Sequence, residues 1–173
     1  MRASPETDGG EIATIGVYGF TAESFLATLR GADVVLVLDV RQRRGVRGAQ
    51  YAWANSLRLQ RALREAGIGY RHLPELAPTT ELRHLQYAED ARVGVGKRNR
   101  EKLAGEYVRR YLAEILDRVD LGTIAASLPE LGRSALMCVE RDPEACHRSL
   151  VAARLAGLLG GSVLDLRPGE ASD

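Results

Sequence analysis

An uninterrupted apolar run from Val34 to Leu38 constrains the fold more than any other feature of this sequence. Because consecutive positions are apolar, a strand formed here presents hydrophobic side chains on both faces of its sheet. Strands that are buried on both faces belong to parallel sheets covered by helices. Helical patterns alternate with further strand-like runs at residues 12–17, 68–73, 134–139 and 162–166. The sequence therefore predicts an α/β three-layer sandwich with a mostly parallel sheet of about five strands.

Capping residues mark the ends of the clearest helices. Thr21 suits an N-cap, with Ser24 at the third position of the capping box, and Gly31 ends that helix. Asp142 and Pro143 are typical of a helix start, which predicts a last helix from there to about residue 159. Further helical segments are predicted at residues 51–66, within a polar insertion at 78–97, and at 98–119. The alternation of strands and helices predicts a Rossmann-like topology, but no dinucleotide fingerprint of glycines follows the first predicted strand.

Length and composition indicate an ordinary globular protein. The chain has 173 residues, of which 45% are hydrophobic and 27% charged, as expected of a domain with a real core. We expect residues 1–10 to be a disordered leader and residues 11–173 to form a single α/β domain. No apolar run approaches the roughly 18 residues of a membrane span, so we expect a cytoplasmic protein without membrane contact. Its two cysteines, Cys138 and Cys146, are expected to be thiols.

Positive charge is concentrated in one segment. Between Arg41 and His72 there are eight arginines and a single acid, Glu65. Such a concentration of positive charge favours an anionic partner. The sequence therefore predicts a phosphate-bearing small molecule or a nucleic acid as the ligand. The short segment Gly94–Lys97 resembles a fragment of a phosphate loop, but it follows no clear strand and carries little weight.

Most of the unusual polar residues follow predicted strands, so they converge at the carboxyl edge of the sheet, where ligands of open α/β folds bind. Glu140 is the first candidate for a catalytic acid, base or nucleophile, and Asp39 is the second. The candidate ligand-binding residues are Arg41, Arg148, His147, Tyr18 and Arg47. The competing interpretation is that Glu140 and Arg41 form an ion pair that merely braces two neighbouring loops.

The segment from Cys138 to Arg148 allows two further interpretations. A phosphatase-like cysteine loop is disfavoured because Glu144 stands six positions after Cys138, where an arginine is needed, and Pro143 lacks an amide. A zinc site of Cys138, Glu140, Cys146 and His147 has suitable ligand types. Adjacent residues on a helix point about 100° apart, however, so we expect no metal and no cofactor here. Free cysteines are most often small core residues, and we favour this interpretation for Cys138, which lies inside an apolar strand.

Several segments together resemble the family catalogued as domain of unknown function 488. They are Ala13–Gly16, the strand ending Asp39-Val40-Arg41, the segment Gly67–Leu76, and above all Leu136–Arg148 with its Cys-x-Glu-Arg-Asp-Pro-x-x-Cys-His-Arg element. The resemblance implies an α/β fold. It also strengthens the case for six residues as site residues, because they lie in the pattern that members share: Asp39, Arg41, Glu140, Cys146, His147 and Arg148. Val17-Tyr18 replaces a polar pair frequent in members, and Arg43-Arg44-Gly45-Val46-Arg47 replaces a Pro-x-Ser-Arg element.

Three functions therefore remain open from the sequence. The first is a hydrolase or transferase that acts at a sugar or phosphate centre through Glu140. The second is a non-catalytic nucleic-acid-binding module that uses the arginine loop. The third is a metal or thiol sensor built on Cys146 and His147.

Overall fold

The computed structural model describes residues 10–169, so apart from Gly10 the predicted leader lies outside the described residues. Five strands of this part of the chain form one sheet in the order β3-β2-β4-β1-β5, and every pair is parallel. The strands are β1 (Glu11–Gly16), β2 (Val34–Asp39), β3 (Gly69–His72), β4 (Arg133–Cys138) and β5 (Val163–Leu166). The predicted parallel sheet is confirmed.

Strand β4 lies between β1 and β2, whereas the Rossmann order places β1 beside β2. Backbone hydrogen bonds continue past the strand ends: the Val139 carbonyl accepts from the Tyr18 amide at 3.0 Å, and the Met137 carbonyl accepts from the Val40 amide at 3.1 Å. The residues that follow β4 therefore lie at the centre of the carboxyl edge, between those that follow β1 and β2.

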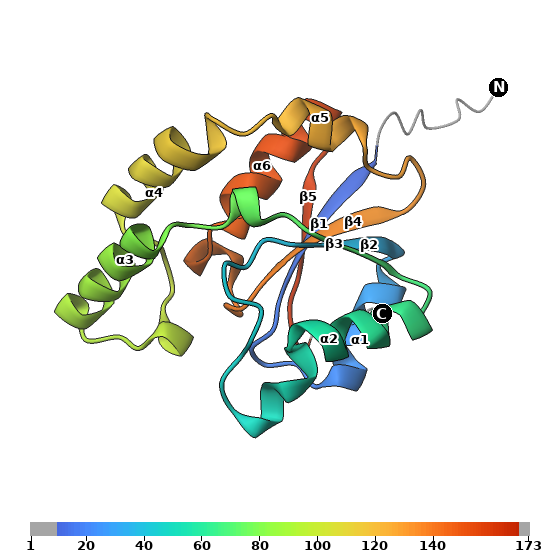
Figure 1. The fold of residues 1–173 in the computed structure, drawn as a ribbon, viewed down its shortest axis with the longest axis horizontal. Helices are drawn as coiled ribbons and strands as arrows, with labels where there is room; N and C mark the ends of the chain where they lie inside the picture. The colour runs from blue at the N-terminus through green and yellow to red at the C-terminus, as the bar shows by residue number, and fades with distance from the viewer. Residues whose placement is uncertain (1–9, 170–173) are drawn as a thin grey trace.

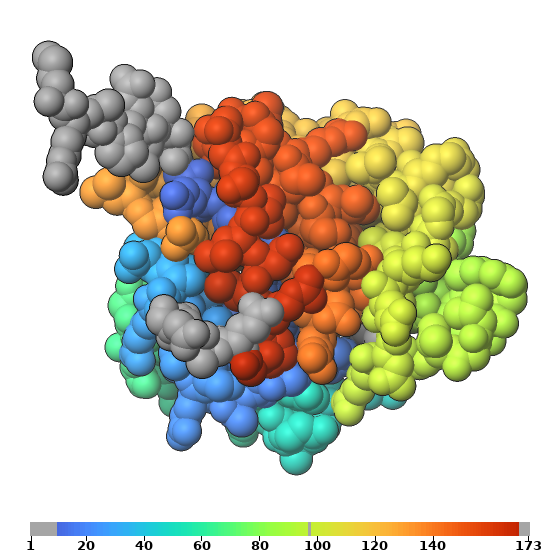
Figure 2. Space-filling model, turned by 180° about the vertical axis from the view of Figure 1, so that it is seen from behind, coloured from blue at the N-terminus to red at the C-terminus, as the bar shows by residue number. Residues whose placement is uncertain are grey.

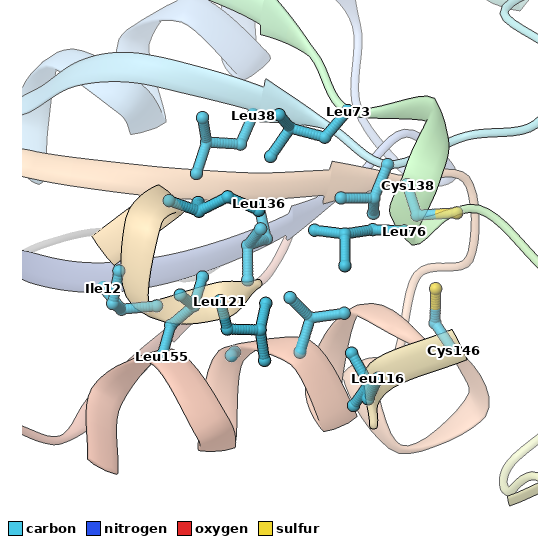
Figure 3. Packing of buried hydrophobic residues seen from close by; sticks show 14 of the residues in the cluster. Ile12, Leu38, Leu73, Leu76, Leu116, Leu121, Leu136, Cys138, Cys146 and Leu155 are labelled. Carbon is cyan, nitrogen blue, oxygen red and sulfur yellow. The ribbon is translucent and has the colours of Figure 1, made fainter. Parts of the chain in front are cut away.

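Helices cover both faces of the sheet (Figure 1), as predicted for three layers. They are α1 (Ala22–Gly31), α2 (Ser56–Glu65), α3 (Thr80–Val93), α4 (Gly105–Tyr111), α5 (Leu121–Ala126) and α6 (Arg148–Leu159). Phe25 of α1 and Leu63 of α2 pack with one set of strand side chains. Leu121 of α5 and Leu155 of α6 pack with the other set (Figure 3). This alternation follows from the pleat, which directs successive side chains to opposite faces.

Two helical predictions were inaccurate in their boundaries. The helix predicted at 98–119 begins only at Gly105 and continues after Tyr111 as a π-helical turn, Leu112–Leu116. Its predicted start is instead the end of a 3-10 turn, Lys97–Asn99, followed by a non-helical segment in which the Arg100 side chain is buried against Asp90. The helix predicted at 51–66 consists of a 3-10 turn, Ala49–Ala54, followed by α2, which begins at Ser56.

The helix predicted to open at Asp142 and Pro143 was also wrong in its start. Pro143–Ala145 forms one 3-10 turn, Cys146 is extended with φ −138° and ψ 144°, and α6 begins at Arg148. Cys146 and His147 are both buried. In a continuous helix their side chains would diverge by about 100°, whereas here the Cys146 sulfur lies 3.8 Å from His147 Nδ1.

Seen from behind, the C-terminal residues, in red, occupy the middle of the molecule, while the yellow and green segments that contain α4 and α3 lie to one side (Figure 2). None of the helices within residues 10–169 combines the length and apolarity needed to cross a membrane.

Candidate functional site

A cleft of about 780 Å³ opens at the carboxyl edge of the sheet. Its floor is formed by Cys138, Val139 and Glu140, which end β4 and follow it, together with Cys146 and His147. The loop after β2 forms one wall, and residues from α3 to the start of α4 form the other. Among the described residues that line the cleft, six arginines surround a single carboxylate, that of Glu140: Arg41, Arg43, Arg47, Arg83, Arg98 and Arg100.

The Asp39 and Arg41 side chains form a buried bidentate pair. Arg41 donates from Nε to Asp39 Oδ1 at 2.9 Å and from Nη2 to Oδ2 at 2.8 Å, and the residues are 0% and 1% exposed. The Tyr70 hydroxyl donates to Asp39 Oδ2 at 2.6 Å. Arg41 also donates to the Ala54 carbonyl. Asp39 thus orients the Arg41 side chain, and both of its carboxylate oxygens already accept hydrogen bonds from Arg41 or Tyr70.

The Glu140 side chain is held at the floor of the cleft. Arg100 Nη1 lies 3.5 Å from Glu140 Oε1, and the Cys138 thiol lies 3.6 Å from Glu140 Oε2 as a weak donor. Arg100 in turn pairs with Asp90 at 2.6 Å. The arginine beside Glu140 is therefore Arg100, whereas the sequence interpretation of a bracing ion pair named Arg41.

A cluster of two thiols and an imidazole lies beside Glu140. Cys138 Sγ, Cys146 Sγ and one ring nitrogen of His147 all lie within 4.8 Å of one another. Cys146 Sγ is 3.8 Å from His147 Nδ1, and His147 Nε2 is 2.9 Å from the Val40 carbonyl oxygen. Because a carbonyl only accepts, Nε2 carries a proton and Nδ1 faces the sulfur. Figure 3 shows both sulfur atoms at the same end of the apolar cluster.

The two thiols differ in protonation. Burial raises the pKa of the Cys146 thiol, but the hydrogen bond from Cys138 and the charge of His147 outweigh it, so this pKa falls well below the usual range. The hydrogen bond to Cys146, together with burial, raises the pKa of Cys138 well above its usual range. Burial lowers the pKa of His147, yet the neighbouring Cys146 charge raises it overall. These pKa directions favour a thiolate at Cys146 beside a charged His147, with the proton on Cys138.

Arg148 lies behind the cleft. Its Nη1 donates to the Glu140 carbonyl at 2.6 Å and its Nη2 to the Arg141 carbonyl at 3.2 Å, and its side chain is fully buried. Arg148 thus fixes the backbone that carries Glu140, and its charge contributes to the low pKa of Cys146.

The mouth of the cleft carries exposed cations beside an aromatic pair. Arg43, Arg47 and Arg98 are exposed, and within the described part of the chain no carboxylate pairs with them. The Arg98 guanidinium lies 5.0 Å from the ring centre of Tyr18 and 5.5 Å from that of Tyr51. The mouth can therefore accept an anionic group.

The cleft brings together five of the residues singled out from the sequence: Glu140, Arg41, His147, Tyr18 and Arg47. Asp39 and Arg148 lie behind it. Asp39 orients the Arg41 side chain, and Arg148 fixes the backbone that carries Glu140. Sequence reasoning missed Arg83, which comes from the insertion, and Arg98 and Arg100, which come from the start of the helix predicted at 98–119. The nearby segment Gly94–Lys97 was the available signal, because Gly96 also lines the cleft.

The comparison with family models gives one match. The model described as "Domain of unknown function DUF488" matches residues 21–155, more than half of the chain. The chain belongs to this family. The matched DUF488 region contains the floor of the cleft and all six lining arginines. No curated protein and no solved structure matches the chain.

Proposed function

We propose that this DUF488 protein binds a phosphate-bearing small molecule, such as a nucleotide, in the arginine-lined cleft and catalyses hydrolysis or transfer at its phosphate or sugar centre. The observation that carries the proposal is the placement of exposed arginines around a cleft whose floor holds one carboxylate, Glu140. Arginine guanidinium groups bind phosphate oxygens in bidentate fashion, and they keep their charge at any physiological pH.

The shape of the cleft favours a small ligand over a polymer. A volume of about 780 Å³ lies within the range typical of small-molecule sites, about 300–1,000 Å³. The arginines also come from two facing walls, the loop after β2 and the segment before α4. Two facing walls surround a compact ligand, whereas a nucleic acid needs a groove or a surface along which its backbone can run.

Glu140 is the residue we assign to proton transfer or nucleophilic attack. One carboxylate oxygen faces Arg100 and the other faces the Cys138 thiol, so the side chain is oriented before a ligand enters. Arg148 and the residues after β4 fix its backbone. Arg41 lines the adjacent wall with its charge paired to Asp39, so, among the described lining residues, the exposed and unpaired positive charge comes from Arg43, Arg47 and Arg98 at the mouth.

Calorimetric titration with inorganic pyrophosphate and with nucleoside triphosphates tests the binding step. Arg47→Gln is expected to weaken affinity by about 10-fold, because one charge-assisted hydrogen bond contributes about 1.5–3 kcal/mol and an exposed one lies at the low end. Arg61→Gln is the matched control, since Arg61 is an exposed arginine of α2 that does not line the cleft. Equal affinities of the two variants would contradict the proposed site.

Turnover is tested with Glu140→Gln. Chromatography of products from a nucleotide panel is expected to show cleavage by the unaltered protein and a loss of about 100-fold or more in this variant, as for other acid–base residues. Binding in the same calorimetric assay should persist. Binding without turnover in both proteins would instead support a binding module.

A further inference from the structure

The thiol and imidazole cluster has a feature that the proposed phosphate chemistry does not use. Cys138 Sγ, Cys146 Sγ and one ring nitrogen of His147 come from the end of β4 and the segment before α6, yet they converge within 4.8 Å, and Nδ1 is the nitrogen that faces Cys146 Sγ. All three residues are buried, and all three line the floor of the cleft. Cysteine sulfur and histidine nitrogen are the ligand atoms that zinc prefers, and three of them lie together here.

The helix break removes the geometric objection to a metal. Cys146 is extended at φ −138° and ψ 144°, so its side chain and that of His147 do not diverge as helix neighbours do. Their donor atoms lie 3.8 Å apart. Donor atoms around a tetrahedral zinc ion, with bonds of about 2.0–2.3 Å, are separated by roughly 3.5 Å. Small side-chain rotations therefore bring the three atoms to ligand distance.

His147 is also oriented as metal-binding histidines are. Its Nε2 donates to the Val40 carbonyl at 2.9 Å, which fixes the ring and leaves Nδ1 toward the two sulfur atoms. Such a hydrogen bond from the second ring nitrogen to a carbonyl or carboxylate accompanies nearly every histidine ligand.

We propose that Cys138, Cys146 and His147 bind one zinc ion through both sulfur atoms and Nδ1, with the fourth position facing the cleft beside Glu140. Binding releases the protons that these groups carry, because zinc requires thiolate and unprotonated imidazole. Three protein ligands with an open fourth position are typical of catalytic zinc sites. The zinc site does not depend on phosphate binding at the mouth of the cleft.

The test measures metal in the full-length protein, purified without a histidine tag, loaded with zinc and dialysed. Elemental analysis is expected to give about one zinc per chain, and cobalt substitution should give the intense visible bands of a tetrahedral site together with thiolate-to-cobalt charge transfer. Zinc titration against a competing chelator then gives the affinity. His147→Gln should weaken it by more than about 100-fold, since even outer hydrogen-bond partners of zinc ligands contribute 10–100-fold.

His84→Gln is the matched control, because His84 is exposed and lines the same cleft without belonging to the cluster. It should bind zinc as the unaltered protein does. The proposal is overturned if the reduced, unaltered protein takes up no zinc, if cobalt gives only weak six-coordinate bands, or if both histidine variants bind equally. Zinc content that persists in Arg47→Gln separates this proposal from the phosphate proposal, because that variant alters only the mouth.

Discussion

The guanidinium of Arg148 donates a 2.6 Å hydrogen bond to the main-chain carbonyl of Glu140, eight residues earlier in the chain. Gly16, at the end of β1, packs against the same carbonyl so closely that a Cβ at this position would overlap its oxygen. The end of β1, the second residue after β4 and the first residue of α6 therefore meet at one point. The backbone that carries Glu140 depends on all three.

Gly16→Ala is expected to destabilise the protein by about 3 kcal/mol, the upper part of the usual range for overpacking, because the obstacle is backbone and cannot rotate away. Gly157→Ala is the control: this glycine lies inside α6 with open space around its Cα, and alanine there should stabilise by about 0.5–1 kcal/mol. Urea unfolding measures both. Similar midpoints for the two variants would contradict the close contact.

Asp39→Asn should cost about 3–5 kcal/mol, because it leaves the buried Arg41 guanidinium without a compensating charge. Tyr70→Phe removes only one neutral donor to the same carboxylate and should cost about 1 kcal/mol. Chemical unfolding of the two variants side by side checks the ranking. A smaller loss for Asp39→Asn than for Tyr70→Phe would show that the pair contributes little.

The Asp90–Arg100 pair predicts an acid dependence of stability. Burial raises the pKa of Asp90, but hydrogen bonds from Arg100 and Gln86 outweigh it, so its pKa lies below the ordinary 3.8. A carboxylate whose pKa is lower in the folded state stabilises the fold above the unfolded pKa and loses this contribution as pH falls through the folded pKa. Unfolding free energies measured between about pH 6 and pH 2.5 should therefore fall less steeply in Asp90→Asn than in the unaltered protein.

Glu89→Gln is the control for this pH series. Arg92 lowers the pKa of Glu89 through a hydrogen bond, but their ion pair lies at the surface, where water and salt screen it. Its removal should leave the acid dependence almost unchanged. An equal effect of both substitutions would contradict a special contribution from the buried pair.

The salt dependence of binding distinguishes a small ligand from a nucleic acid. For a single-stranded oligonucleotide, log affinity falls with log salt at a slope of about −0.7 for each phosphate neutralised. We expect a slope no steeper than about −2 for the cleft, because only the exposed arginines at its mouth are available to neutralise phosphates. A steeper slope that flattens in Arg43→Gln/Arg47→Gln, measured by fluorescence anisotropy, would favour the nucleic-acid-binding alternative.

Local patterns were sufficient to predict the layers of this protein and much of its site. The run from Val34 to Leu38 predicted a parallel sheet because only a strand covered on both faces can bury such a run. Arg41 and Glu140 could be placed at one edge because parallel strands end there together. Both inferences depend on residues close in sequence to a strand, so no knowledge of the strand order was needed.

Tertiary structure alone decided which residues complete the cleft. Arg98 and Arg100 lie between α3 and α4 and line the cleft opposite the loop after β2, and the buried pair of Arg100 with Asp90 is a contact that no local pattern encodes. The helix start predicted at Asp142 gave way to an extended Cys146. Capping preferences contribute only about 1 kcal/mol, so the packing of the buried Cys146 and His147 side chains at the carboxyl end of the sheet can override them. Long-range packing therefore determined the site wherever it opposed local preference.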